Sequence, residues 1–225
     1  MAWLRGMAMA LCAVLVGSVM GQGAATQRGE KEIQADMDAV EAKMKELVPE
    51  MEKLNDVKFR KENGAKIAPL MMQLANLHGE MAAVKSGFGK AMQEAGRYTM
   101  LYMAMAMGDK EAERVLTEMA SREAEPFSTA KMALTLGNWL KHADAPKAQQ
   151  KMLDDFVAVV KANPEDTSVA GMLRVMAQTA ANKEISDKVV EVIKTNLKEE
   201  LAKSVIAQLD AEKAKKNIES KPQGK

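Results

Sequence analysis

Hydrophobic residues recur at intervals of three and four positions over most of this chain, a spacing that predicts amphipathic helices. In two segments the intervals alternate strictly between three and four, which is the heptad pattern of helices that pack side by side. The first segment has its hydrophobic residues at Ile33, Met37, Val40, Met44, Leu47, Met51 and Leu54. The second has them at Ile67, Leu70, Leu74, Leu77, Met81, Val84 and Phe88. Because a short polar stretch joins the two, we expect residues 26–89 to form an antiparallel helical hairpin.

The connection between the two patterns is rich in residues that favour turns. Residues 55–64 contain an Asn-Asp pair and an Asn-Gly pair and are predicted to form a loop. Because this predicted loop is short, we expect the two helices to pair with each other within one chain and not with helices of another chain. Pro49 either kinks the first helix or begins a short helix after the first has ended near Leu47. Pro69 is predicted to lie in the first turn of the second helix, where a proline is tolerated.

Residues 90–212 are predicted to form a bundle of short helices with short connections. Gly108, Pro126, Pro146 and Pro164 fall between helical patterns, where they would end one helix or begin the next. No segment shows the alternation of polar and β-branched residues that predicts a strand. The predicted fold class is therefore all-α.

The last part of the chain divides into a helical stretch and a polar stretch. The hydrophobic pattern of residues 186–209 predicts either one long helix or two helices that are broken near Thr195 and Asn196. Residues 213–225 are polar and rich in lysine, so we expect a disordered tail.

One part of the predicted bundle resembles a tetratricopeptide repeat. The residues that match the family's pattern are Leu136, Gly137, Leu140, Phe156 and Pro164. Met152 and Val159 depart from it, because the family has small alanines at these two positions. The resemblance implies a TPR-like α-solenoid, in which short helices stack in pairs, for residues 90–212.

Residues 1–25 have the three-part pattern of a secretory signal peptide. Arg5 supplies the positive charge, residues 6–20 are uncharged and mostly apolar, and residues 21–25 offer small side chains to a signal peptidase. The alternative is an uncleaved membrane anchor, but the apolar stretch is shorter than the ~20 residues that span a bilayer. We therefore expect a cleaved signal and a protein located in the periplasm or secreted.

Removal of such a signal changes what chemistry the chain can carry. Cys12 is the only cysteine, so the mature protein would have no thiol for catalysis or metal binding. Without Arg5, the 32 basic residues would fall to 31 and equal the 31 acidic residues. A neutral protein is a poor partner for nucleic acid, whose affinity comes largely from neutralised phosphates. No later stretch is apolar enough to span a membrane, so we expect membrane contact only through an uncleaved signal.

The chain has 20 methionines, and several of them gather in residues 98–107. On a helix, Met100, Met103 and Met107 would share one face, and three thioethers could bind a soft ion such as Cu(I). Methionine is also a flexible filler of hydrophobic cores. Core packing is the interpretation that the abundance of methionine elsewhere in the chain favours.

No catalytic motif accompanies this pattern. His78 and His142 lie far apart with no ligand spacing near them, and most carboxylates stand beside lysines on outward helix faces. Trp139 and Phe156 would be anchors for a partner if they were exposed. We therefore expect a non-catalytic protein without a cofactor, which binds or scaffolds another protein or peptide in the cell envelope. The alternative function is Cu(I) binding at the methionine cluster.

Overall fold

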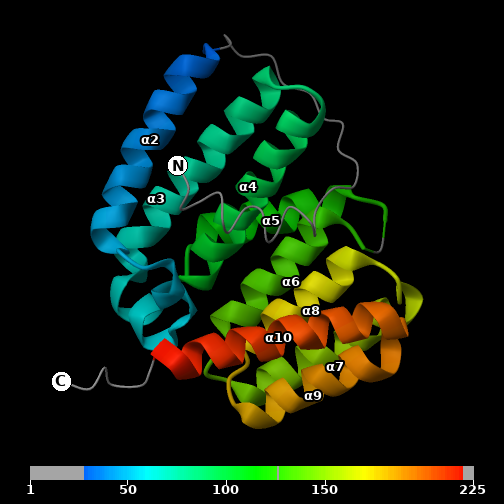
Figure 1. Ribbon diagram of the computed structural model, residues 1–225. Coiled ribbons are helices and arrows are strands. Elements are labelled where there is room, and N and C mark those ends of the chain that lie inside the picture. The colour runs from blue at the N-terminus through cyan, green and yellow to red at the C-terminus, as the bar shows by residue number, and fades with distance from the viewer. Residues whose placement is uncertain (1–27, 126, 220–225) are drawn as a thin grey trace, which may run out of the picture. The chain divides into compact units, whose positions relative to one another are not determined.

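The computed structural model describes residues 28–125 and 127–219, which divide into two compact units, one that ends at Asp144 and one that begins at Ala145. The described residues form nine α-helices and one short 3-10 helix and contain no strand, which confirms the all-α fold class (Figure 1). The first unit contains α2 (Glu30–Leu47), the 3-10 helix η1 (Met51–Asn55), α3 (Val57–Val84), α4 (Gly87–Ala106), α5 (Lys110–Arg122) and α6 (Thr129–Lys141). The second contains α7 (Pro146–Ala162), α8 (Thr167–Gln178), α9 (Lys183–Asn196) and α10 (Glu199–Glu219).

The two heptad patterns lie on α2, η1 and α3, and α2 and α3 contact each other and lie side by side in Figure 1. The buried residues of the two patterns are Ile33, Met37, Val40, Met44 and Leu54, and Ile67, Leu74, Leu77 and Met81. Leu47, Leu70 and Val84 are half-buried. Phe88 departs furthest from the pattern, because α3 ends at Val84 and Phe88 lies 73% exposed at the start of α4.

The connection between α2 and α3 lies earlier in the chain than the sequence predicts. α2 ends at Leu47, and the 3-10 helix follows Pro49, in agreement with one of the two alternatives for this proline. The predicted loop over residues 55–64 is wrong, because α3 already begins at Val57. Asp56 caps this helix, since its Oδ1 accepts a hydrogen bond of 3.0 Å from the backbone N–H of Phe59. Pro69 consequently lies inside α3 and not in its first turn.

α4 is the central helix of the first unit and packs against α3, α5 and α6. Its residues 98–106 are all buried, so this stretch contacts neighbours on every side. These contacts tie α4 to the helices before and after it. The two compact units divide after Asp144, and α4 belongs to the first of them together with α2 and α3.

In the second unit, helices that are next but one along the chain pack against each other. α7 contacts α9, α8 contacts both α9 and α10, and α9 contacts α10. The interior is formed by Leu153, Phe156, Val160, Val169, Leu173, Met176, Ile185, Val189, Ile193, Val205 and Leu209. The stretch predicted as one helix or two forms two, because the chain leaves the helix between Asn196 and Glu199. α10 continues past Lys213, where the sequence predicts a polar tail, as far as Glu219.

The predicted signal peptide, residues 1–25, lies outside the described residues. Within residues 28–125 and 127–219, each helix is too short or too polar to cross a membrane.

Candidate functional site

The structure places the predicted methionine cluster in the core of the first unit. Met100 and Met103 are each 3% exposed on α4, and Met107 is half-buried where this helix ends. Met105 is fully buried and packs against Gly137 of α6. In the part of the chain that the structure describes, His, Cys, Asp and Glu side chains nowhere gather in threes in a way that would hold a metal ion. The surroundings of these thioethers are those of core residues.

Neither predicted aromatic anchor is exposed. Trp139 of α6 is 0% exposed, and Phe156 of α7 is 6% exposed. Their large apolar surfaces are used in packing, which is the usual role of such side chains in small helical cores. In this structure both side chains are buried, so neither forms part of an exposed surface.

His78 joins α3 to α4 and has the environment of a packing residue. Its Nδ1 lies 2.7 Å from Oε1 of Gln93, and its ring covers Gly96, where an added β-carbon would lie 2.7 Å from two ring atoms. Burial lowers the pKa of His78, and the hydrogen bond with Gln93 opposes this effect. His142 lies where α6 ends, and its Nδ1 donates a hydrogen bond of 2.9 Å to the carbonyl of Asn138.

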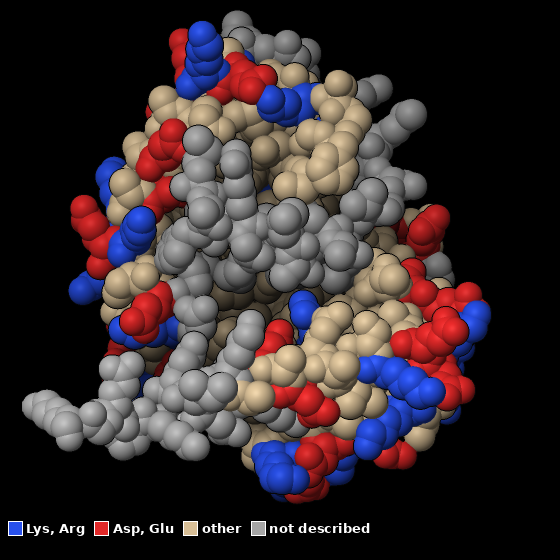
Figure 2. Space-filling view, in the orientation of Figure 1, with Lys and Arg blue, Asp and Glu red and all other residues tan. Residues whose placement is uncertain are grey.

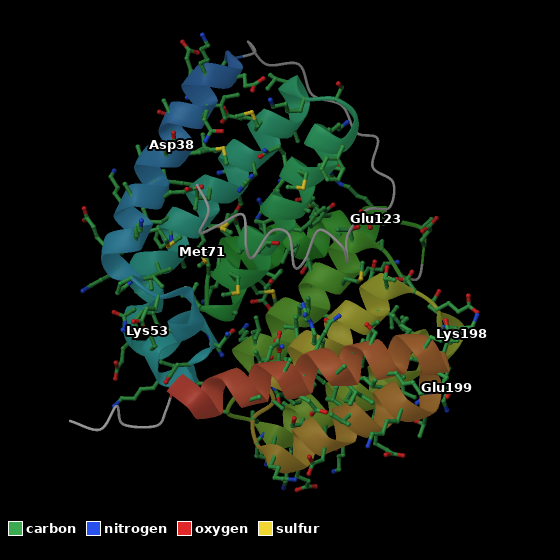
Figure 3. All side chains as sticks on the ribbon, viewed as in Figure 1. Asp38, Lys53, Met71, Glu123, Lys198 and Glu199 are labelled. Atoms are coloured by element: carbon green, nitrogen blue, oxygen red, sulfur yellow. The ribbon has the colours of Figure 1, made fainter. Side chains whose placement is uncertain are left out.

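The strongest candidate for a binding site is a groove in the second unit with a volume of about 530 Å³. It lies between the C-terminal end of α8, the first half of α9 and α10, at the opposite end of α9 from the Lys198–Glu199 connection that Figure 3 labels. Its lining residues are Ala177, Gln178, Ala180, Asn182, Lys183, Ser186, Asp187, Val190, Leu209 and Glu212.

Hydrogen bonds within the unit hold the polar walls of this groove. Asn182 caps α9, since its Oδ1 accepts a hydrogen bond of 2.9 Å from the N–H of Ile185. Ser186 donates from Oγ to the carbonyl of Ala177 at 2.9 Å and so ties α9 to α8. The cap does not use the NH₂ group of Asn182, so this group can donate to a ligand in the groove.

Charged side chains at the groove pair with one another. Lys183 and Asp187 form an ion pair along α9, and Gln178 of α8 donates a hydrogen bond to Glu212 of α10. Arg174 approaches the same Glu212 carboxylate at 3.7 Å. Figure 2 shows Lys, Arg, Asp and Glu side chains interspersed over the visible surface of this unit. The groove therefore combines apolar side chains with charges of both signs.

A buried glutamine that the sequence pattern did not single out supports the rim of the groove. Gln149 of α7 is fully buried, and its Oε1 accepts a hydrogen bond of 2.7 Å from the N–H of Ala181. Its Nε2 donates to the carbonyl of Thr179 at 3.3 Å. Both bonds hold the connection between α8 and α9. The sequence does hold one indication that Gln149 is buried. It precedes Leu153 by four residues and so lies on the apolar face of α7.

No family model, no curated protein and no solved structure matches this chain.

Proposed function

We propose that this chain is an exported, non-catalytic binding protein whose second unit holds a peptide segment of a partner protein. The observation that carries the proposal is the groove between α8, α9 and α10. Val190 and Leu209 offer apolar contacts, while Asn182 and Lys183 offer hydrogen-bond donors to a peptide carbonyl or carboxylate. A peptide presents both kinds of group along its length.

The packing order of the second unit supports a repeat-like binding module. In helical-repeat proteins each short helix stacks on the corresponding helix of the next pair, and the stacked pairs line an extended binding surface. α7 contacts α9 and α8 contacts α10 in this way. We therefore extend the proposal to a TPR-like arrangement of α7 to α10. In the first unit, α2 and α3 would form the proposed helical hairpin and act as a scaffold.

The chemistry of the groove favours binding over catalysis. Its two carboxylates, Asp187 and Glu212, have partners in Lys183 and in Gln178. General acid–base catalysis most often uses a histidine, and the residues that line the groove include none. Both histidines of the chain, His78 and His142, belong to the first unit.

The sequence supports our proposal that the protein binds its partner outside the cytoplasm. Residues 1–25 have the pattern of a secretory signal, and the chain without them is neutral. Neutrality and the interspersed surface charges favour a protein or peptide partner over a nucleic acid. We therefore propose that the partner belongs to the cell envelope or the secreted fraction.

A peptide-display experiment tests this proposal. The chain without residues 1–25 is panned against a random peptide library, and selected peptides are labelled for measurement of the dissociation constant. Val190→Arg places a long charged side chain in the groove, so we expect the affinity to fall at least about tenfold. Circular dichroism checks that the variant remains folded.

Val192→Arg is the matched control, because Val192 is also half-buried on α9 but does not line the groove. We expect this variant to bind the selected peptides like the wild type. Equal binding by the wild type and the folded Val190→Arg variant would exclude the groove as the binding site. Failure to select any peptide would remove the proposed peptide-binding function.

A further inference from the structure

Met107 differs from the other methionines of the run on α4 in its access to solvent. Met100, Met103 and Met105 are at most 3% exposed, whereas Met107 is half-buried where the helix ends. The four side chains belong to one short segment, in which the first three lie on α4 and Met107 is the residue that ends this helix.

Two close helix contacts explain this difference. Met105 is covered by α6, because an added β-carbon at Gly137 would lie 2.6 Å from the Met105 sulfur. At Met107 the contact with α3 involves the backbone, since a β-carbon at Gly64 would lie 2.9 Å from the Met107 carbonyl oxygen and 3.2 Å from its Cβ. α3 therefore holds the main chain and the Cβ of Met107, and the residue as a whole remains half-buried.

We propose that Met107 is a site of reversible oxidation by small hydroperoxides. A lone pair of the thioether sulfur attacks one peroxide oxygen, the O–O bond breaks, and the sulfur loses two electrons to become a sulfoxide. The departing hydroxide takes a proton and leaves as water, or as an alcohol when the oxidant is an alkyl hydroperoxide. Susceptibility of a methionine to this reaction follows its exposure, and sulfoxide reductases reverse it.

The position of Met107 confines the effect of the added oxygen. A sulfoxide is polar, and on a half-buried side chain it can stay hydrated without opening the core. The same oxygen on Met105 would lie between α4 and α6, where packing leaves no room for it. Oxidation of Met107 is thus compatible with the folded protein, whereas oxidation of Met105 first requires local opening.

The oxidation of the four methionines can be compared within one tryptic peptide. Trypsin cleaves after Arg97 and after Lys110, so all four lie in the peptide of residues 98–110. The folded chain without residues 1–25 is treated with hydrogen peroxide, quenched and digested. Fragment spectra then locate the first oxygen in the peptide. We expect Met107 to react at least about tenfold faster than Met105, and the difference to vanish in denaturant.

Two leucine variants serve as a matched pair. Met107→Leu should abolish the early single-oxygen product of this peptide, and Met105→Leu should leave it unchanged. Helical circular dichroism should persist after one oxygen has been added, and treatment with methionine sulfoxide reductases should remove that oxygen. The proposal is overturned if the native protein takes up oxygen at Met105 as fast as at Met107. It is also overturned if the first oxygen at Met107 unfolds the protein.

Discussion

Met105 of α4 fills the space that a side chain at Gly137 of α6 would need. A β-carbon added at Gly137 would lie 2.6 Å from the sulfur of Met105 and 3.3 Å from its Cγ. Both residues are buried, so the thioether has little room to move aside. The close approach of α4 and α6 therefore depends on the absence of a side chain at this position.

Gly137→Ala is expected to lower the free energy of unfolding by about 1 to 2 kcal/mol, because the cost of overpacking exceeds the gain in helix propensity. Urea denaturation followed by circular dichroism measures this change. Gly89→Ala on α4 is the control, since its β-carbon would come no closer than 3.6 Å to the Lys85 side chain.

A second variant tests whether the contact with Met105 causes the expected loss of stability in Gly137→Ala. In a Met105→Ala background, which leaves a cavity, Gly137→Ala should become neutral or stabilising. If Gly137→Ala costs the same in both backgrounds, the contact with Met105 does not explain its effect.

Arg60 connects three elements of the first unit through one buried guanidinium group. It donates to the carbonyl of Leu54 at 2.6 Å and to that of Leu140 at 2.9 Å, and burial lowers its pKa. Arg60→Met would leave both carbonyls without this donor, so we expect a loss of about 2 to 4 kcal/mol in the free energy of unfolding.

The adjacent Lys61 provides the control for this prediction. Its ion pair with Asp144 is exposed, so Lys61→Met should cost less than about 1 kcal/mol. Similar losses for both variants in chemical denaturation would contradict the role assigned to the buried hydrogen bonds.

His78 should make the protein less stable in mildly acidic solution. Burial lowers the pKa of the folded state below the ordinary value of about 6.5, so the unfolded chain binds more protons between these two values. The contribution of His78 is complete above the unfolded pKa and is lost as the pH falls through the folded pKa. The free energy of unfolding should therefore decrease from about pH 7 toward pH 5.

His78→Gln removes the titrating group and keeps a side chain that can bond to Gln93. Denaturation curves at a series of pH values should show a flatter dependence for this variant than for the wild type. Carboxylates titrate in both proteins, so the difference between the curves isolates His78. Parallel curves for the two proteins would refute the prediction.

The methionine cluster can be tested for metal binding without disturbing its packing. Replacing Met100, Met103 and Met107 by leucine keeps the volume of each side chain approximately, and each change should cost less than about 1.5 kcal/mol. Because these residues have the surroundings of core side chains, we expect the wild type and the triple variant to have the same affinity for Cu(I). Competition with a chromogenic chelator measures this affinity. A large loss of affinity in the folded triple variant would support the metal site.

The helical fold and much of its core could be predicted from the sequence, since both follow from periodicity. The heptad residues Ile33, Met44, Ile67 and Met81 are buried because three-and-four spacing places them on one helix face. Residues 55–64 show where such local reasoning fails. The Asn-Gly pair in this segment favours a turn, but the Asp56 cap and the packing of Gly64 against Met107 support a helix.

The candidate groove could not be predicted from local patterns. Its walls come from Gln178, Asp187 and Leu209 on three different helices, which no short motif brings together. Trp139 and Phe156 were plausible anchors by residue type, yet burial depends on which helix faces meet in three dimensions. Periodicity predicts that a face is apolar and does not identify the helix that covers it.

The bonds from Gln149 have a consequence for how this protein can be divided into fragments. The rim of the groove between α8 and α9 rests on a side chain from α7, although α7 contributes no lining residue. A fragment that starts at Thr167 would retain all ten lining side chains and lose the support of Thr179 and Ala181. The smallest fragment that keeps the groove as the structure shows it therefore extends beyond the lining residues and has to include α7.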